Sequence, residues 1–242
     1  MENIIDLISD YYFIIQDESI NKNVINIKNL KWKSRENLIH IDFEKINKNE
    51  YKKILKKFLH IYKLKSMTKN KIGVKSGTKV LLGYISNYDK KCKEQNDFIE
   101  AICAILFKKK KERYNYIYDT VCDFLDSGFY GENLCDFKEN KCGEKRNSNL
   151  TCGCCRHYKI KLIGPITPWV VCEHLKEDHT CGAKCLSCKL YTCDYLKRKG
   201  IRYRIKDILL LDVFFNPIQK YFIKYMVYTP KEKIIKRLMF LW

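Results

Sequence analysis

The sequence predicts an α+β protein in three parts: a mixed α/β region at residues 1–127, a metal-stapled cysteine-rich module at 128–199, and a basic three-helix tail at 200–242. Three observations lead to this prediction. Short β-branched runs alternate with helical patterns in the first part. Ten of the thirteen cysteines lie between Cys135 and Cys193, and helix-start signals recur after them.

The length and the N-terminus limit the class of protein. A chain of 242 residues can bury the core of one large domain or two ordinary ones. Glu2, Asp6 and Asp10 stand where a signal peptide needs a basic stretch followed by an apolar one. The apolar windows near the C-terminus are interrupted by charges and are too short to span a membrane. We therefore expect a soluble, cytoplasmic chain, in a reducing compartment where clustered cysteines bind metal or perform redox chemistry.

The net charge of +19 is unevenly distributed. Residues 1–121 carry a surplus of ten positive charges, residues 122–200 of three and residues 201–242 of six. A basic surface favours nucleic acid, an anionic membrane or an acidic protein as partner. The lysine, isoleucine and asparagine content typical of an AT-rich genome explains the same surplus equally well.

Local patterns predict the elements of the first part. Residues 24–27, 38–43 and 80–85 are rich in β-branched and apolar side chains, which predicts strands. Asn47 is an N-cap residue with Glu50 three positions later, so a helix is expected to begin there.

Two longer helices are predicted by apolar residues at helical spacing. The first covers residues 98–106 and the second residues 114–125, with Gly128 as a stop signal. Cys103 and Cys122 fall on the apolar faces, and we expect them to be small buried hydrophobic residues rather than ligands.

The tail carries three helix signals. Residues 205–215 form an apolar helical run, and Asn216, followed by proline, predicts the start of a second helix. Thr229, Pro230 and Glu232 match a capping box with proline at the first helical position, which predicts a third.

The cysteine cluster predicts a metal site. Zinc takes four ligands in a tetrahedron, and Cys185 and Cys188 have the commonest spacing for two of them. The cluster is large enough for one or two zinc ions, and an iron–sulfur cluster is the alternative. The candidate ligands are Cys135, Cys142, Cys152, Cys154, Cys155, Cys172, Cys181, Cys185, Cys188, Cys193 and His174.

Two stretches of this region resemble known families. Cys-Gly-Cys-Cys at 152–155, followed by Cys-Glu-His-Leu at 172–175, resembles the YkgJ-type cysteine-cluster proteins, which implies a zinc- or iron-chelating domain. Residues 123–142 and 184–201 resemble cysteine-rich proteins of clostridia and related Firmicutes. The chain lacks the Arg-Pro before a Cys-Arg that usually closes the YkgJ pattern and has Leu-Ser-Cys-Lys-Leu-Tyr-Thr-Cys at 186–193 instead. The cysteines that match this pattern are Cys152, Cys154, Cys155, Cys172, Cys181, Cys188 and Cys193.

Three functions fit these observations. In the first, metal holds a rigid binding module whose basic flanks contact an acidic protein or nucleic acid. The second is an iron–sulfur or metal-dependent enzyme, although no Ser/His/Asp, HExxH or zinc-deaminase pattern is present. The third is thiol-based metal handling or sensing. The candidate partner-binding residues follow the last cysteine and are Lys197, Arg198, Lys199, Arg202, Tyr203 and Arg204.

Overall fold

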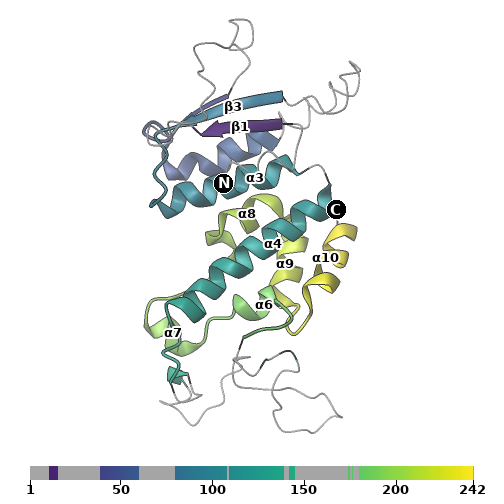
Figure 1. Cartoon of the computed structure of the whole chain (residues 1–242). Helices are drawn as coiled ribbons and strands as arrows, with labels where there is room; N and C mark the ends of the chain where they lie inside the picture. The colour runs from purple at the N-terminus through teal and green to yellow at the C-terminus, as the bar shows by residue number, and fades with distance from the viewer. Residues whose placement is uncertain are drawn as a thin grey trace, which may run out of the picture. The chain divides into compact units, whose positions relative to one another are not determined.

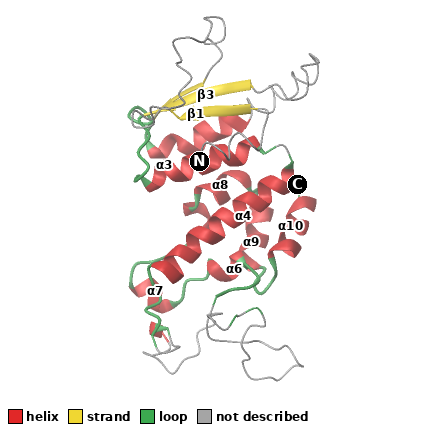
Figure 2. Cartoon of the chain, viewed as in Figure 1, coloured by secondary structure: helices red, strands yellow, loops and turns green. Residues whose placement is uncertain are grey.

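The residues that the structure describes are mostly helical with one small sheet, which agrees with the α+β class (Figure 2). The computed structural model describes residues 11–15, 39–59, 80–107, 109–138, 142–144, 174, 176 and 180–241. Two compact units divide the chain at Arg113 and Tyr114. The sequence-based division at residues 127 and 199 stays a prediction.

The sheet of the first unit has three parallel strands in the order β1-β3-β2. The strands are β1 (Tyr11–Ile15), β2 (Ile39–Asp42) and β3 (Val80–Ser86). Tyr11 pairs with Val80 and Ile39 pairs with Gly83 (Figure 1 shows β1 beside β3). The strands predicted near 38–43 and 80–85 are confirmed. Strand β1 was not predicted, and the strand expected at 24–27 lies outside the described residues.

A helix follows β2 as the sequence predicts. Asn47 and Glu50 form a capping box on the 3-10 turn η3 (Lys48–Glu50), and a helix continues over residues 51–59. Tyr51 packs against Phe98 with ring centroids 4.8 Å apart, and Phe43 lies 5.7 Å from Phe98. These three rings pack the end of β2 against the helix at 51–59 and against the helix that contains Phe98, in the core of the first unit.

The two longer helices are α3 (Lys93–Leu106) and α4 (Lys110–Asp126), which ends in the π-helical turn η4 (Ser127–Gly131). Arg113 donates hydrogen bonds to the carbonyls of Ala104 and Phe107, so a cation caps the C-terminus of α3. Cys103 is 4% exposed and Cys122 is fully buried. Both thiols are therefore buried on apolar helix faces, as predicted.

The described residues of the second unit form six further elements (Figure 1). They are α6 (Leu186–Lys189), α7 (Asp194–Arg198), the 3-10 turn η5 (Ile205–Asp207), α8 (Leu209–Phe214), α9 (Pro217–Tyr225) and α10 (Lys231–Phe240). The predicted three-helix tail is thus confirmed as α8, α9 and α10. Asn216 caps α9 in a capping box with Gln219.

The capping box predicted at Thr229 is wrong. Pro230 is the N-cap of α10 and no side chain caps that helix. The Thr229 hydroxyl instead donates to the carbonyl of Val227, 3.2 Å away. A hydroxyl that bonds its own turn is not available to the helix end.

Gln219 connects three helices in the core of this unit. Its side chain is 2% exposed, and Nε2 donates to the Tyr114 hydroxyl at 3.0 Å, the Leu238 carbonyl at 3.0 Å and the Leu241 carbonyl at 2.9 Å. A buried amide satisfied in this way fixes α4, α9 and α10 in one arrangement. In the part of the chain that the structure describes, no helix is long and apolar enough to cross a membrane.

Candidate functional site

The Cys-x2-Cys pair, Cys185 and Cys188, lies in a short turn at the start of α6 (Leu186–Lys189). Cys185 precedes the first residue of α6 and is 1% exposed. The nearby Cys188 thiol, first, and the backbone N–H groups of Cys188, Thr229 and Ser187 favour the charged form more than desolvation disfavours it, and they lower the pKa of Cys185 to about 6. The surroundings of Cys185 therefore favour its thiolate form.

A second turn, between α9 and α10, lies against the first. The N–H of Tyr228 donates to Sγ of Cys188 at 3.3 Å, and Sγ of Cys185 lies 3.5 Å from the carbonyl oxygen of Met226. The N–H of Lys231 also donates to the carbonyl of Ala183 at 3.2 Å. Both sulfurs of the Cys-x2-Cys pair are thus bonded to the backbone that connects the last two helices.

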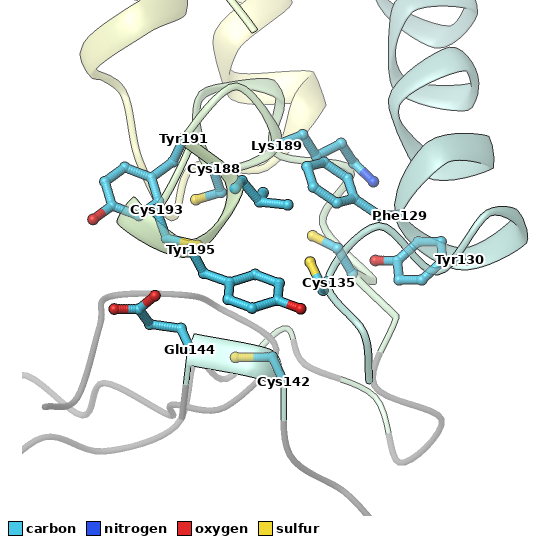
Figure 3. A pocket seen from close by; sticks show the side chains of 12 residues that line it. Phe129, Tyr130, Cys135, Cys142, Glu144, Cys188, Lys189, Tyr191, Cys193 and Tyr195 are labelled. Atoms are coloured by element: carbon cyan, nitrogen blue, oxygen red, sulfur yellow. The ribbon is translucent and has the colours of Figure 1, made fainter. Parts of the chain in front are cut away.

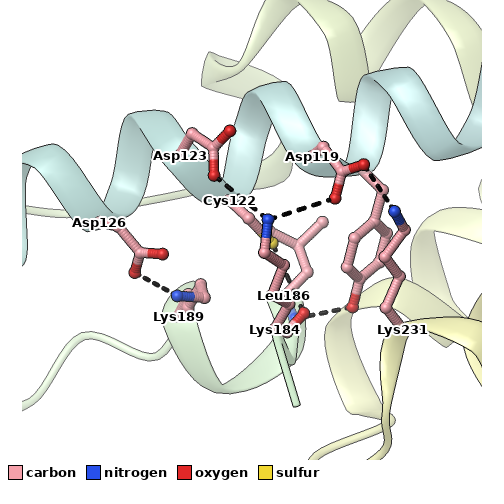
Figure 4. A network of polar contacts seen from close by, with 9 residues as sticks. Asp119, Cys122, Asp123, Asp126, Lys184, Leu186, Lys189 and Lys231 are labelled. Carbon is pink, nitrogen blue, oxygen red and sulfur yellow. Dashed lines mark hydrogen bonds and ion pairs between the residues drawn. The ribbon is translucent and has the colours of Figure 1, made fainter. Parts of the chain in front are cut away.

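Helix α4 supports the turn from the other side (Figure 4). The Tyr118 hydroxyl accepts a hydrogen bond from the N–H of Leu186 at 2.8 Å. The Cys122 thiol donates to the carbonyl of Lys184 at 3.5 Å. Burial raises the pKa of Cys122 to about 12, so this thiol stays protonated and remains a donor.

Three aspartates along α4 pair with lysines of the cysteine-rich segment and of α10. Lys184 lies between Asp119 and Asp123, with its Nζ 3.6 Å from an oxygen of each (Figure 4). Lys231 Nζ lies 2.6 Å from Asp119. The sequence reasoning missed this role. The detectable signal was the spacing of these acids at positions 119, 123 and 126, which share one side of a helix.

The third aspartate makes the most buried of these pairs. Asp126 contacts Nζ of Lys189, whose side chain is 4% exposed. A buried ammonium is stable only with a partner that compensates its lost hydration. The pair therefore fixes the end of α6 against α4 (Figure 4).

A small cavity of about 40 Å³ adjoins α6. Figure 3 shows the side chains of Cys135, Cys142, Cys188 and Cys193 around it, with the Tyr195 ring reaching between them. The residues that line the cavity are Phe129, Tyr130, Cys135, Cys142, Glu144, Cys181, Cys188, Lys189, Tyr191, Cys193, Tyr195 and Leu196. Five predicted ligands thus share one sulfur-rich cavity.

Gly143 permits the close packing at this cavity. Its N–H donates to the carbonyl of Cys135 at 2.8 Å. A Cβ at this position would lie 2.6 Å from Cε2 of Tyr195 and 2.7 Å from its hydroxyl oxygen. A side chain at residue 143 would therefore require the Tyr195 ring to move.

The predicted metal ligands are therefore partly brought together. Cys135, Cys142, Cys181, Cys188 and Cys193 line the cavity, and Cys185 lies in the adjoining turn. The carbonyl of His174 accepts from the N–H of Gly182 at 2.8 Å, which places residue 174 beside Cys181. Cys152, Cys154, Cys155 and Cys172 lie outside the described residues. Within the described residues, no three His, Cys, Asp or Glu side chains form a group that could hold a metal ion.

Most of the predicted partner-binding cations form ion pairs near their own segment. Lys197 pairs with Asp194 at 2.8 Å, Arg198 with Glu144 at 2.9 Å, and Arg204 with Asp207 through two nitrogens. The Nζ of Lys199 lies 4.6 Å from the centre of the Tyr195 ring, and Arg202 is exposed. Carboxylates close to these cations reduce the positive potential of the segment.

The aromatic residue of that segment packs inward. The Tyr203 ring lies 5.6 Å from the Phe129 ring and 6.3 Å from the Phe124 ring, both edge to face. Burial raises the pKa of Tyr203, with Glu132 and Cys135 adding to the shift. Base stacking on Tyr203 stays a prediction, and it would compete with these ring contacts.

No known protein supplies a further guide to the site. The sequence matches no family model and no curated protein, and the structure matches no solved structure. The geometry of the described residues is therefore the basis for the function.

Proposed function

We propose that this chain is a metal-binding protein, with zinc as the metal, and that Cys185 and Cys188 supply two of the ligands. The observation that supports it is the set of N–H groups around these two sulfurs. Tyr228 N–H donates to Cys188 at 3.3 Å, and the N–H groups of Ser187, Cys188 and Thr229 help to lower the pKa of Cys185. The thiolate is the form of cysteine that binds metal, and backbone N–H groups stabilise that form.

Burial strengthens the argument for a cation. Cys185 is 1% exposed, and a buried thiolate is costly unless an opposite charge compensates it. A divalent ion supplies that charge and bonds the sulfur directly. Hydrogen bonds from the surrounding turns then orient the ligands, as outer groups do around zinc.

A zinc tetrahedron needs two more ligands. Cys188 also lines the cavity that contains Cys135, Cys142, Cys181 and Cys193, so these four are candidates from the described part of the chain. The remaining candidates are His174 and the four cysteines at positions 152, 154, 155 and 172. Ten clustered cysteines are enough for one ion or for two.

The site is structural in this proposal. It joins α4, the cysteine-rich turns and the α9–α10 turn, and it holds a basic surface for an acidic partner, nucleic acid among them. The net charge of +19 supports such a partner. Binding of nucleic acid should weaken steeply as salt is raised, because released counterions drive the association.

The test is metal analysis of the full chain purified without oxygen, together with its visible spectrum. We expect zinc, no visible colour, and thiolate charge-transfer bands after cobalt replaces zinc. Cys185→Ser with Cys188→Ser should lose at least one metal equivalent. The matched control, Cys92→Ser with Cys103→Ala, should retain the metal content of the wild type.

Two results would contradict the proposal. Wild-type protein without bound metal would overturn it, as would a double variant at 185 and 188 with undiminished metal. A brown protein that contains iron and sulfide would replace zinc by an iron–sulfur cluster.

A further inference from the structure

Helix α9 exposes an aromatic face. Ile218, Tyr221 and Tyr225 are 54%, 62% and 54% exposed, although all three are large. Their spacing places them along one side of the helix, while Gln219 and Ile223 are 2% and 0% exposed on the other. The apolar side that the fold needs is therefore already used, and the outward rings have no role in the core.

The two outward tyrosines form a pair with a cation beside it. Their ring centroids are 4.5 Å apart with an angle of 45° between the planes. The Nζ of Lys224, which is exposed, lies 4.9 Å from the centre of the Tyr225 ring. Both rings are more than half exposed, so a planar group can reach them and stack beside this pair.

The positive charge around this face favours an anionic ligand. Residues 217–240 contain six Lys or Arg and one acid, Glu232. Nη1 of Arg237 lies 3.3 Å from the sulfur of Met226, which places an exposed guanidinium at the end of α9. Carboxylates pair with Lys220 and Lys231, but Lys224 and Arg237 remain exposed.

We propose that the α9 face binds single-stranded nucleic acid, with bases stacked on Tyr221 and Tyr225 and phosphates beside Lys224 and Arg237. Single-strand binding without sequence preference uses two features, aromatic rings that stack on bases and cations that contact phosphates, and this face has both. An acidic peptide would use the cations and leave the rings without a purpose. A lipid surface would favour aliphatic side chains outward, whereas α9 turns tyrosines outward and Ile223 inward.

This assignment rests on the proposed function in one respect, because the metal-bound turn holds the α9–α10 turn in place. It differs from the sequence-based expectation in where the partner binds. The cations at 197, 198 and 204 are paired with nearby acids, and Tyr203 packs on Phe129. The α9 face offers rings and cations that point outward.

The test measures binding of the full chain to a fluorescent oligothymidine and an oligouridine of about 16 nucleotides. We expect Tyr221→Ala with Tyr225→Ala to raise the Kd at least about tenfold, because each base that loses its stacking ring loses binding free energy. Tyr221→Phe with Tyr225→Phe should bind like the wild type, since the rings remain. Lys224→Gln should reduce the salt slope of binding by about 0.7, the value for one single-strand phosphate. Lys206→Gln, an exposed control on η5, should leave binding by the α9 face unchanged.

Several outcomes would overturn the assignment. They are no oligonucleotide binding by the wild type, equal binding by the alanine and phenylalanine pairs, or ring-dependent binding only to phosphatidylserine vesicles. A wild-type dimer that the alanine pair dissociates would assign the face to a second copy instead.

Metal content is measured on every sample, so the two proposals fail separately. Metal-free protein that still needs both rings would retain this inference and overturn the metal site. Metal-loaded protein that binds oligonucleotide without needing either ring would retain the metal site and overturn this inference.

Discussion

The backbone N–H of Tyr228 points at the sulfur of Cys188, 3.3 Å away, across 40 residues of sequence. Tyr228 adopts a left-handed conformation with φ of 56°, and the N–H of the next residue, Thr229, helps to lower the pKa of Cys185. A C-terminal turn therefore completes the surroundings of both sulfurs in the Cys-x2-Cys pair. Four predictions follow from the contacts around this pair and the adjoining cavity.

Tyr118→Phe should destabilise the chain by about 1–3 kcal/mol, because the buried N–H of Leu186 loses its acceptor. Urea unfolding measures this loss. The same variant should release zinc to a chelator faster, since Leu186 follows Cys185 directly. Tyr221→Phe removes an exposed hydroxyl and serves as the control, with little change expected in either measurement. Equal stability of the two variants would contradict the role of the Tyr118 hydroxyl.

Asp126→Asn should cost about 3–5 kcal/mol, because it leaves the buried ammonium of Lys189 without a compensating charge. Lys189→Met should cost less, since the Asp126 that remains is 26% exposed and can be hydrated. The double variant should be more stable than the sum of both losses predicts. Strict additivity in denaturant unfolding would show that the two charges do not interact.

Gly143→Ala should destabilise the chain by about 1–3 kcal/mol, because its methyl group would overlap the Tyr195 ring. The ring is the far end of a side chain, so it can move aside, which limits the cost. In a Tyr195→Ala background the added methyl group should cost much less. A double-mutant cycle measures this coupling, and an unchanged cost in that background would refute the overlap.

The chelator-treated, reduced chain should become more stable as pH rises from about 6 to about 9. The pKa of Cys185 is about 6 in the folded chain against an ordinary 9.0, so the unfolded chain binds the extra proton in this window. The stabilisation is fully present above the unfolded pKa and is lost as pH falls through the folded one. Cys185→Ser should flatten this rise in the free energy of unfolding.

Cys122→Ala is the matched control for that titration. Burial raises the pKa of Cys122 to about 12, so this thiol stays protonated in the folded chain between pH 6 and 9. The rise should therefore persist in Cys122→Ala. A rise that also persists in Cys185→Ser would show that another group titrates there.

Local chemistry made much of the helical structure predictable. The apolar stripe from Tyr114 to Leu125 and the capping box at Asn216 depend on neighbours within a few residues, so the sequence contains the whole signal. The burial of Cys103 and Cys122 followed from the same periodicity. Strand β1, with the sequence YYFII, carries a local signal that was not used, since aromatic and β-branched residues favour strands. Its pairing with β3, about 70 residues away, depends on the fold.

By itself, the sequence determined that cysteines cluster between Cys135 and Cys193, that Cys185 and Cys188 have ligand spacing, and that the flanks are basic. Only the tertiary structure decided which groups surround the sulfurs. It brought the N–H of Tyr228 to Cys188 and the hydroxyl of Tyr118 to Leu186, and it left the rings of α9 exposed. The physical reason is that hydrogen bonding and burial depend on which distant segments pack together, whereas spacing and charge are properties of the chain itself.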